Sequence, residues 1–218
     1  SGVYEDLHAV FFTDSQTGLT VGSSGTILLT TDGGTTWRLQ QSHTSSNLNA
    51  MCFLDSRNAT VVGDGGTLLQ SYNGGLTWIP VASRTPANLR SVAATSERTR
   101  IVVGDAGVII REAFQEEDWK LQSSGTSTNL ESVYFFGANH GVSVGRNGMI
   151  LWTKDEGLTW ENRTKGLFTT LNSVASADCN FLTAVGNSGL ILHSSDGGGT
   201  WNSRPSGTSQ HLYGVTFT

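Results

Sequence analysis

Carboxylates are the side chains of this sequence that could perform acid–base chemistry. Hydrolysis of a glycosidic bond needs two opposed carboxyl groups, and Glu131 is the clearest candidate for one of them. Spacing alone does not settle whether Asp64 or Asp105 is its partner. The sequence also contains no G-x-S-x-G, P-loop or H-E-x-x-H motif. We therefore assign no catalytic residue and expect the protein not to be an enzyme.

Histidines could instead hold a metal ion. His8 and His211 occupy neighbouring phases of a 41-residue repeat, and His43 is expected on the same face. A metal-bound histidine usually donates its other ring nitrogen to a carboxylate or a carbonyl group. The spacing implies no such carboxylate, so we predict neither a metal site nor a cofactor.

The elements that position these side chains follow from the fixed period of 41 residues. Tryptophan recurs at Trp37, Trp78, Trp119, Trp160 and Trp201, and leucine at Leu7, Leu48, Leu89, Leu130, Leu171 and Leu212. A period of this length indicates a repeat architecture. Residues shared by all copies are therefore expected to build the fold, and residues that differ are candidates for a specific function.

Each period predicts four short strands. The first begins at the periodic leucine, as in 130–135, and the second is a β-branched run that ends in Val-Gly. Glycines such as Gly63 and Gly66 flank a two-residue connection, which predicts a tight hairpin turn before the apolar third strand. The fourth strand follows Thr-Trp. Four short antiparallel strands in about 40 residues form one propeller blade.

We therefore predict an all-β fold, a five-bladed β-propeller in a single domain, residues 1–218. The expected blades are residues 7–47, 48–88, 89–129, 130–170 and 171–211. The first-strand motif occurs a sixth time at 212–217, and we expect this surplus strand to close the ring in competition with residues 7–12. A monomer is expected, with a strand-swapped oligomer as the alternative.

The turn before each tryptophan carries a resemblance to known proteins. Residues 31–37 and 195–201 read T-D-G-G-T-T-W and S-D-G-G-G-T-W, which resemble the Asp boxes of bacterial neuraminidases. Residues 154–160 keep most of this motif, residues 72–78 have asparagine in place of aspartate, and the third copy, from Phe114 onward, has lost it. The complete unit, L-x-x-V-x-F … V-G-x-x-G-x-I-L … D-G-G-x-T-W, resembles the photosystem II stability/assembly factor family.

That resemblance implies a noncatalytic propeller that binds a protein partner, since photosynthetic members of the family bind a membrane-protein assembly intermediate. The aspartates of the boxes are expected to lock their own turns, and the tryptophans to pack between blades. The residues expected to be structural are Asp32, Trp37, Asn73, Trp78, Trp119, Asp155, Trp160, Asp196 and Trp201.

Binding residues are expected where equivalent positions differ between repeats. These positions are the hairpin tips, the interblade loops and the residue after each periodic leucine. The resulting candidates are Asn49, Arg84, Arg90, Glu131, Arg146, Asn172, Asn187 and Tyr213. Of these, Arg84, Arg90 and Arg146 could form one asymmetric patch for a protein partner.

The function hypotheses are, in order, a protein-binding scaffold, a multivalent carbohydrate-binding propeller and an Asp-box glycoside hydrolase. The formal charge of −5 and pI near 5.4 argue against nucleic acid as a partner. No apolar run approaches the roughly 20 residues of a membrane span. No signal peptide is visible, and exported, periplasmic or lumenal placement after processing stays open.

Overall fold

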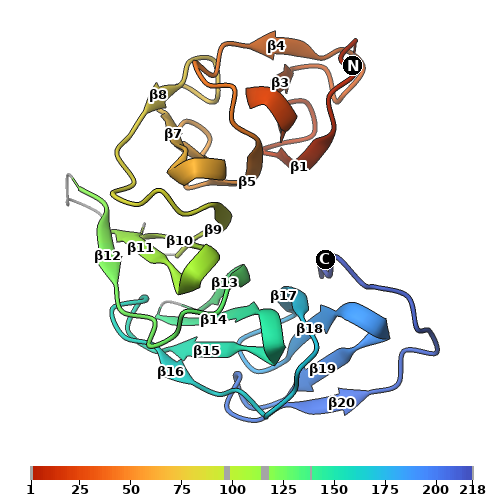
Figure 1. Ribbon diagram of the computed structural model, residues 1–218. Coiled ribbons are helices and arrows are strands. Elements are labelled where there is room, and N and C mark those ends of the chain that lie inside the picture. Colours follow the sequence, from red (N-terminus) through yellow and green to blue (C-terminus); the bar gives the residue numbers. More distant parts are fainter. Residues whose placement is uncertain (1, 96–98, 114–117, 138, 218) are drawn as a thin grey trace. The chain divides into compact units, whose positions relative to one another are not determined.

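The computed structural model describes residues 2–95, 99–113, 118–137 and 139–217. Within these residues the strands form five four-stranded sheets, and the strands of each sheet lie in chain order (Figure 1). We call the sheets blades 1 to 5. The chain divides into two compact units, residues 1–94 and 95–218, and each is described by itself. The single domain over 1–218 stays a prediction.

The strands begin where the repeat predicts them. Blade 1 contains β1 (Leu7–Phe12), β2 (Gly18–Gly22), β3 (Ile27–Thr30) and β4 (Arg38–Gln40). Blade 2 contains β5 (Leu48–Phe53), β6 (Ala59–Gly63), β7 (Leu68–Ser71) and β8 (Ile79–Pro80). Blade 3 contains β9 (Leu89–Ala94), β10 (Arg100–Gly104), β11 (Ile109–Glu112) and β12 (Lys120–Gln122).

The last two blades follow the same order. Blade 4 contains β13 (Leu130–Phe136), β14 (His140–Gly145), β15 (Ile150–Thr153) and β16 (Glu161–Asn162). Blade 5 contains β17 (Leu171–Ser176), β18 (Leu182–Gly186), β19 (Ile191–Ser194) and β20 (Asn202–Arg204). Residues 212–217 belong to none of the five sheets, whereas β1 pairs with β2 in blade 1. Ring closure by residues 212–217 therefore stays a prediction.

The connection between the second and third strands differs from the predicted two-residue hairpin. Each blade has a three-residue 3₁₀ turn there: η1 (Ser23–Gly25), η2 (Asp64–Gly66), η3 (Asp105–Gly107), η4 (Arg146–Gly148) and η5 (Asn187–Gly189). The middle residue of every turn has a left-handed backbone, with φ of 55° at Ser24 and 63° at Gly65. The connection is one residue longer than predicted, and its middle residue and the following glycine both take positive φ, as in a type I′ turn.

The core lies between consecutive blades. Leu171 and Trp201 of blade 5 are 0% and 4% exposed and belong to one apolar cluster with Val142, Val144 and Ile150 of blade 4. Alternate side chains of a strand point to opposite faces, so blade 4 presents one apolar face to blade 5. The first unit repeats this arrangement between blades 1 and 2.

A close backbone approach explains the glycine that ends the second strand in blades 1, 2, 4 and 5. Gly145, at the end of β14, lies against the carbonyl oxygen of Asn129, and a Cβ at position 145 would overlap this oxygen. The Arg146 N–H donates a hydrogen bond of 3.0 Å to the same carbonyl. Because Leu130 follows Asn129 directly, this contact fixes where the periodic leucine enters the blade.

The Asp boxes lock the turns between third and fourth strands. The Asp32 carboxylate accepts hydrogen bonds from the Thr36 hydroxyl (2.6 Å), the Thr36 N–H (2.8 Å) and the Thr30 hydroxyl (2.8 Å). These hydrogen bonds, with the Thr36 hydroxyl first in importance, lower the pKa of Asp32 to about 2. Asn73 makes the same turn with an amide, because its Nδ2 donates to the Thr77 hydroxyl at 2.8 Å.

The other complete boxes behave in the same way. Burial by itself would raise the pKa of Asp155, but hydrogen bonds from Thr159 and Thr153 outweigh it and lower the pKa. The pKa of Asp196 is also lowered, mainly by the backbone N–H of Thr200. These contacts are those expected of structural residues. Residues 114–117, which hold the degenerate third copy, lie outside the described residues.

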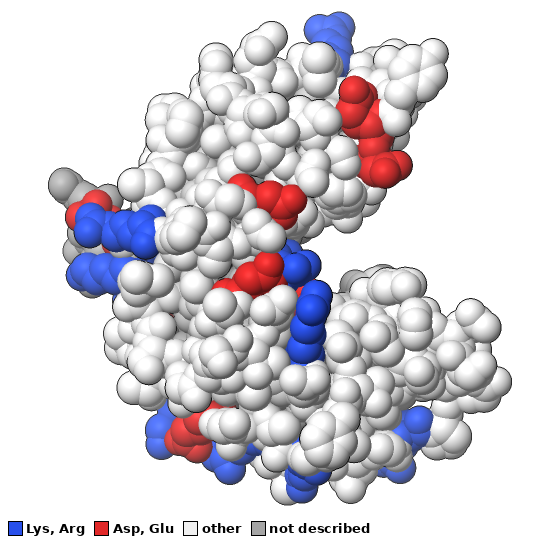
Figure 2. Space-filling view, viewed as in Figure 1, with Lys and Arg blue, Asp and Glu red and all other residues white. Residues whose placement is uncertain are grey.

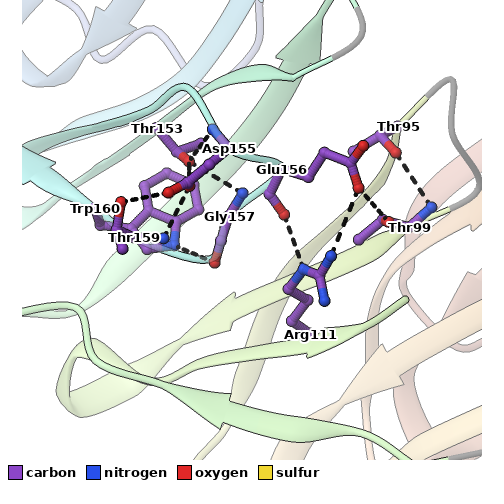
Figure 3. A network of polar contacts seen from close by, with 9 residues as sticks. All are labelled: Thr95, Thr99, Arg111, Thr153, Asp155, Glu156, Gly157, Thr159 and Trp160. Carbon is purple, nitrogen blue, oxygen red and sulfur yellow. Dashed lines mark hydrogen bonds and ion pairs between the residues drawn. The ribbon is translucent and has the colours of Figure 1, made fainter. Parts of the chain in front are cut away.

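The blade 4 box also reaches blade 3. Glu156 takes the place of the first glycine of the motif and has a φ of 55°. Its carboxylate accepts a hydrogen bond from the Thr99 hydroxyl at 2.8 Å and lies 3.5 Å from the Arg111 guanidinium (Figure 3). The Nε–H of Arg111 donates to the Glu156 carbonyl at 3.0 Å. The box therefore joins two neighbouring blades of the second unit.

Replacing Gly145 by alanine should destabilise the fold by about 1–3 kcal/mol or more, because the added methyl overlaps a backbone oxygen that cannot move independently. Chemical unfolding measures this change. Gly214→Ala is the matched control, since a Cβ at position 214 meets nothing within 4 Å. Equal unfolding midpoints for the two variants would contradict the proposed steric role.

The Asp32 box should respond to acid. Because the folded-state pKa is about 2 and the unfolded-state value is about 3.9, this group stabilises the fold above about pH 4, and that contribution is lost as the pH falls towards about 2. Asp32→Asn, which copies Asn73, should keep most stability at neutral pH and lose less than the parent protein on acidification. Asp32→Ala should lower the urea midpoint at neutral pH. A parent-like acid response of Asp32→Asn would contradict the assignment.

Candidate functional site

Polar pairs occupy the end of each blade that carries the 3₁₀ turn. In blades 1, 2, 4 and 5 the residue after the periodic leucine, on the first strand, contacts the first residue of that turn. The pairs with printed contacts are His8–Ser23 (3.3 Å), Asn49–Asp64 (2.9 Å), Glu131–Arg146 (3.0 Å) and Asn172–Asn187 (3.0 Å). In blade 3, Arg90 and Asp105 hold the equivalent positions. Every pair is different, so the chemistry at this end changes from blade to blade.

Several of these side chains also form hydrogen bonds with the backbone of the following repeat. Asn49 Nδ2 donates to the carbonyl of Leu89 at 2.9 Å, and Asn172 Nδ2 donates to the carbonyl of Leu212 at 2.8 Å. His8 Nδ1 makes the same contact with the Leu48 carbonyl at 2.9 Å, where it must be the donor because a carbonyl oxygen only accepts. These residues, predicted for binding or considered as a metal ligand, thus hold consecutive periodic leucines in place.

The residue before the periodic leucine makes a second kind of hydrogen bond between repeats. Asn47, Asn88 and Asn129 each accept a hydrogen bond through Oδ1 from the middle residue of a 3₁₀ turn. His211 replaces asparagine in the last copy, and its Nδ1 accepts from the Ser188 N–H at 3.0 Å. The imidazole is therefore oriented by the same backbone contact that orients the amides.

The second unit brings five of the eight predicted binding residues into one pocket of about 510 Å³. We call it the blade 4–5 pocket. It is lined by Glu131, Arg146, Thr170, Asn172, Asn187, His211 and Tyr213. Its lining combines an ion pair, two amides and an exposed phenol, which suits hydrogen bonding to peptide groups and contact with apolar side chains.

Arg146 supplies the guanidinium group of the pocket. Its Nε lies 3.0 Å from Glu131 Oε1, and its side chain is 55% exposed while that of Glu131 is 15% exposed. The Tyr213 ring is 73% exposed and lies edge-on to the His211 ring at 6.1 Å. The carboxylate therefore holds one edge of the guanidinium while most of this cation stays open to solvent.

The remaining predicted binding residues lie outside this pocket. Asn49, Arg84 and Arg90 belong to the first unit. Arg84 has a φ of 62° at the tip of an interblade loop. Figure 2 shows Lys and Arg side chains as separate groups on the face in view, several beside acidic side chains. The basic patch predicted from Arg84, Arg90 and Arg146 stays a prediction.

Thr170 and His211 were not among the predicted binding residues. The signal that could have found them is the repeat itself, because they are in register with Asn47, Asn88 and Asn129. The described residues bring no three His, Cys, Asp or Glu side chains together in a way that could hold a metal ion. No helix among them has the length and hydrophobicity needed to cross a membrane.

Comparison with known proteins identifies the repeat. The family model described as photosynthesis system II assembly factor YCF48 matches residues 3–111 and 111–214. No curated protein matches the sequence. Among solved structures, YCF48 bound to D1 peptide is 17% identical, with 93% of this chain and 82% of that chain covered and a TM-score of 0.55.

Two further structures are similar. YCF48 from Cyanidioschyzon merolae is 18% identical, with 100% and 91% of the two chains covered and a TM-score of 0.62. The computationally designed Ika8 protein is 16% identical, with 100% of this chain and 67% of that chain covered and a TM-score of 0.78. Identities this low establish the fold alone. The prediction of an all-β propeller with five four-stranded blades is confirmed.

Asn172→Ala should loosen residues 212–217, because it removes the hydrogen bonds to Asn187 and to the Leu212 carbonyl. The expected loss is about 1–3 kcal/mol. Hydrogen exchange of the Leu212 amide, which is bonded to the Gly186 carbonyl at 3.0 Å, should become faster. Asn180→Ala, in the exposed turn between β17 and β18, is the control. An unchanged hydrogen-exchange rate of the Leu212 amide would show that Asn172 does not hold residues 212–217 in place.

Proposed function

Since the chain belongs to the photosynthesis system II assembly factor YCF48 family, we propose that it is a noncatalytic propeller that binds a polypeptide segment of a protein partner. The blade 4–5 pocket, at the interblade-loop end of these blades, is the proposed contact surface. The observation that carries this proposal is the convergence of Glu131, Arg146, Asn172, Asn187 and Tyr213 on one pocket.

The pocket offers groups that suit an extended peptide. The guanidinium of Arg146 presents donors in a planar fork, which fits carboxylates and backbone carbonyls. Asn187 accepts from Asn172 through Oδ1, so its NH₂ group is left to donate. Tyr213 supplies an exposed aromatic surface. Arginine and tyrosine are the residue types that most often dominate protein interfaces.

Carbohydrate binding by equivalent interblade sites is less well supported. Avidity from weak sites requires that the same site recurs, but the polar pair changes from His8–Ser23 to Asn49–Asp64 within the first two blades. For glycoside hydrolysis, Glu131 would need a second, opposed carboxylate. Glu131 is the only carboxylate among the described residues that line the blade 4–5 pocket.

The proposal is tested by fluorescence anisotropy with a labelled D1 peptide, the ligand seen with YCF48. Arg146→Ala should weaken binding about tenfold or more, because a charge-assisted hydrogen bond contributes about 1.5–3 kcal/mol. Arg146→Lys should recover part of the affinity, since it restores the charge without the planar fork.

Arg38→Ala is the control variant, since Arg38 is exposed on the outer strand β4 of blade 1. Absence of saturable binding by the folded protein, or equal weakening by Arg146→Ala and Arg38→Ala, would contradict the proposal. A glycan array probed in parallel separates the carbohydrate-binding alternative, which predicts binding there and none to the peptide.

A further inference from the structure

The middle residue of a 3₁₀ turn carries a backbone N–H that its own turn does not use. In four of the five blades this N–H donates to the side chain just before the next periodic leucine. The pairs are Ser24–Asn47 (3.2 Å), Gly65–Asn88 (2.9 Å), Ala106–Asn129 (3.0 Å) and Ser188–His211 (3.0 Å). The acceptor is an amide oxygen in three blades and an unprotonated imidazole nitrogen in the fourth. These four turns therefore receive an uncharged acceptor from the chain itself.

Blade 4 is the exception. Its middle residue is Asn147, and Thr170 stands before the next periodic leucine. Asn147 has φ of 54° and ψ of 33°, close to the 55° and 28° of Ala106, so the two turns direct their N–H groups alike. The Thr170 carbonyl accepts from the Asn187 N–H at 2.9 Å, as the Asn129 carbonyl does at 3.0 Å in the preceding repeat. The backbone is therefore the same, and only the side chain differs.

Threonine at this position is too short to reach the turn. Its hydroxyl oxygen is one covalent bond closer to the backbone than the Oδ1 of an asparagine. Within the described part of the chain, the Asn147 N–H donates to no acceptor, and Asn147 is exposed. Thr170 and Arg146, the neighbour of Asn147, both line the blade 4–5 pocket. A backbone donor therefore lies open at the edge of this pocket, within the second unit.

The loop that carries Thr170 differs from the other interblade loops along its length. Positions 42, 83, 124 and 206 are serine, and positions 44, 85, 126 and 208 are threonine. In those four loops the serine hydroxyl donates to the threonine carbonyl. The loop before blade 5 has Lys165 and Leu167 instead, followed by Phe168, which is 89% exposed. Departures from an otherwise shared pattern are where a specific function is expected.

We propose that an amide carbonyl group of the bound polypeptide accepts the hydrogen bond of the Asn147 N–H. It takes the place that an asparagine Oδ1 occupies in blades 1, 2 and 3. The inference rests on the proposed function, because it names a chemical group that the blade 4–5 pocket recognises. An amide is inferred rather than a carboxylate, since the acceptors at this place in the other blades are uncharged and Glu131 already lies against Arg146. Main-chain amides and the side chains of asparagine and glutamine share this chemistry.

Thr170→Asn tests the inference, because it gives the chain its own acceptor for the Asn147 N–H. The midpoint of thermal unfolding should rise by about 2–4 °C, as expected for one added hydrogen bond. Fluorescence anisotropy with the labelled D1 peptide should show binding weakened about tenfold, because the carbonyl of the peptide loses its donor. A residue with a purely structural role would not combine a more stable fold with weaker binding.

Thr31→Asn is the matched control. It makes the same chemical change at an exposed position in the Asp-box turn of blade 1, and Thr31 does not line the blade 4–5 pocket. The D1 peptide should therefore bind this variant as it binds the parent protein.

Amide hydrogen exchange measures the contact directly. In the free parent protein, the Asn147 amide should exchange faster than the amides of Ala106 and Ser188, which are hydrogen-bonded. Addition of the D1 peptide should slow exchange at Asn147 about tenfold or more. Thr170→Asn should slow it without peptide. The measurement on the parent protein decides the question even if Thr170→Asn folds poorly.

Peptide variants identify the source of the carbonyl group. Each asparagine and glutamine of the D1 peptide is replaced by alanine in turn. Loss of protection at Asn147 with one of these variants assigns a side-chain amide, and protection that survives all of them assigns a main-chain carbonyl. Loss of protection on replacing an aspartate or glutamate, or on amidating the C-terminus, would identify a carboxylate and contradict the inference.

Two outcomes separate this inference from the proposed function. Saturable peptide binding that leaves the Asn147 amide unprotected, or that Thr170→Asn does not weaken, overturns the inference and leaves the proposed function standing. Absence of binding by the folded parent protein overturns both.

Discussion

Packing between consecutive blades is the interaction on which this structure depends. A four-stranded blade of about 40 residues has no interior of its own, so its apolar side chains are buried only by its neighbours. A tryptophan such as Trp201 buries about 150–250 Å², which corresponds to at most about 4–6 kcal/mol of hydrophobic stabilisation. Leu171, which has no exposed surface, marks the centre of the same contact. The need to bury each blade against its neighbours explains why the apolar residues recur every 41 residues.

The same requirement explains where chemical variety is tolerated. Positions that face a neighbouring blade must remain apolar and of similar volume, whereas the blade ends contact solvent. The polar pairs at the 3₁₀ turns therefore range from amide–amide to an ion pair without a change in the backbone. They are not wholly free to vary, because Asn49 and Asn172 also hold the next periodic leucine through its carbonyl. Binding chemistry and interblade geometry share these side chains.

Much of the fold could be predicted from the sequence because each structural requirement recurs at a fixed spacing. The strand beginnings at the leucines, the Val-Gly ends and the locked turn at Asp32 all follow from local chemistry. The 3₁₀ turns were not predicted, because residues such as Ser24 have no intrinsic preference for a left-handed backbone. The pairing of Glu131 with Arg146, fifteen residues away, depends on hairpin register and needed the structure. Residue type alone made His211 a candidate metal ligand. Its Nδ1 instead accepts the backbone hydrogen bond that an asparagine Oδ1 accepts in the earlier repeats, and this equivalence is visible only in the structure.

Glu156 shows how a repeat protein tolerates a damaged copy. The motif copy that precedes β12 has degenerated at Phe114, and Trp119 is nevertheless 1% exposed. Glu156, from the following repeat, reaches Thr99 and Arg111 of blade 3 (Figure 3). A contact supplied by one copy thus reinforces its neighbour. Adjacent repeats therefore stabilise each other. A blade can form even where its own copy of the motif has lost the consensus residues.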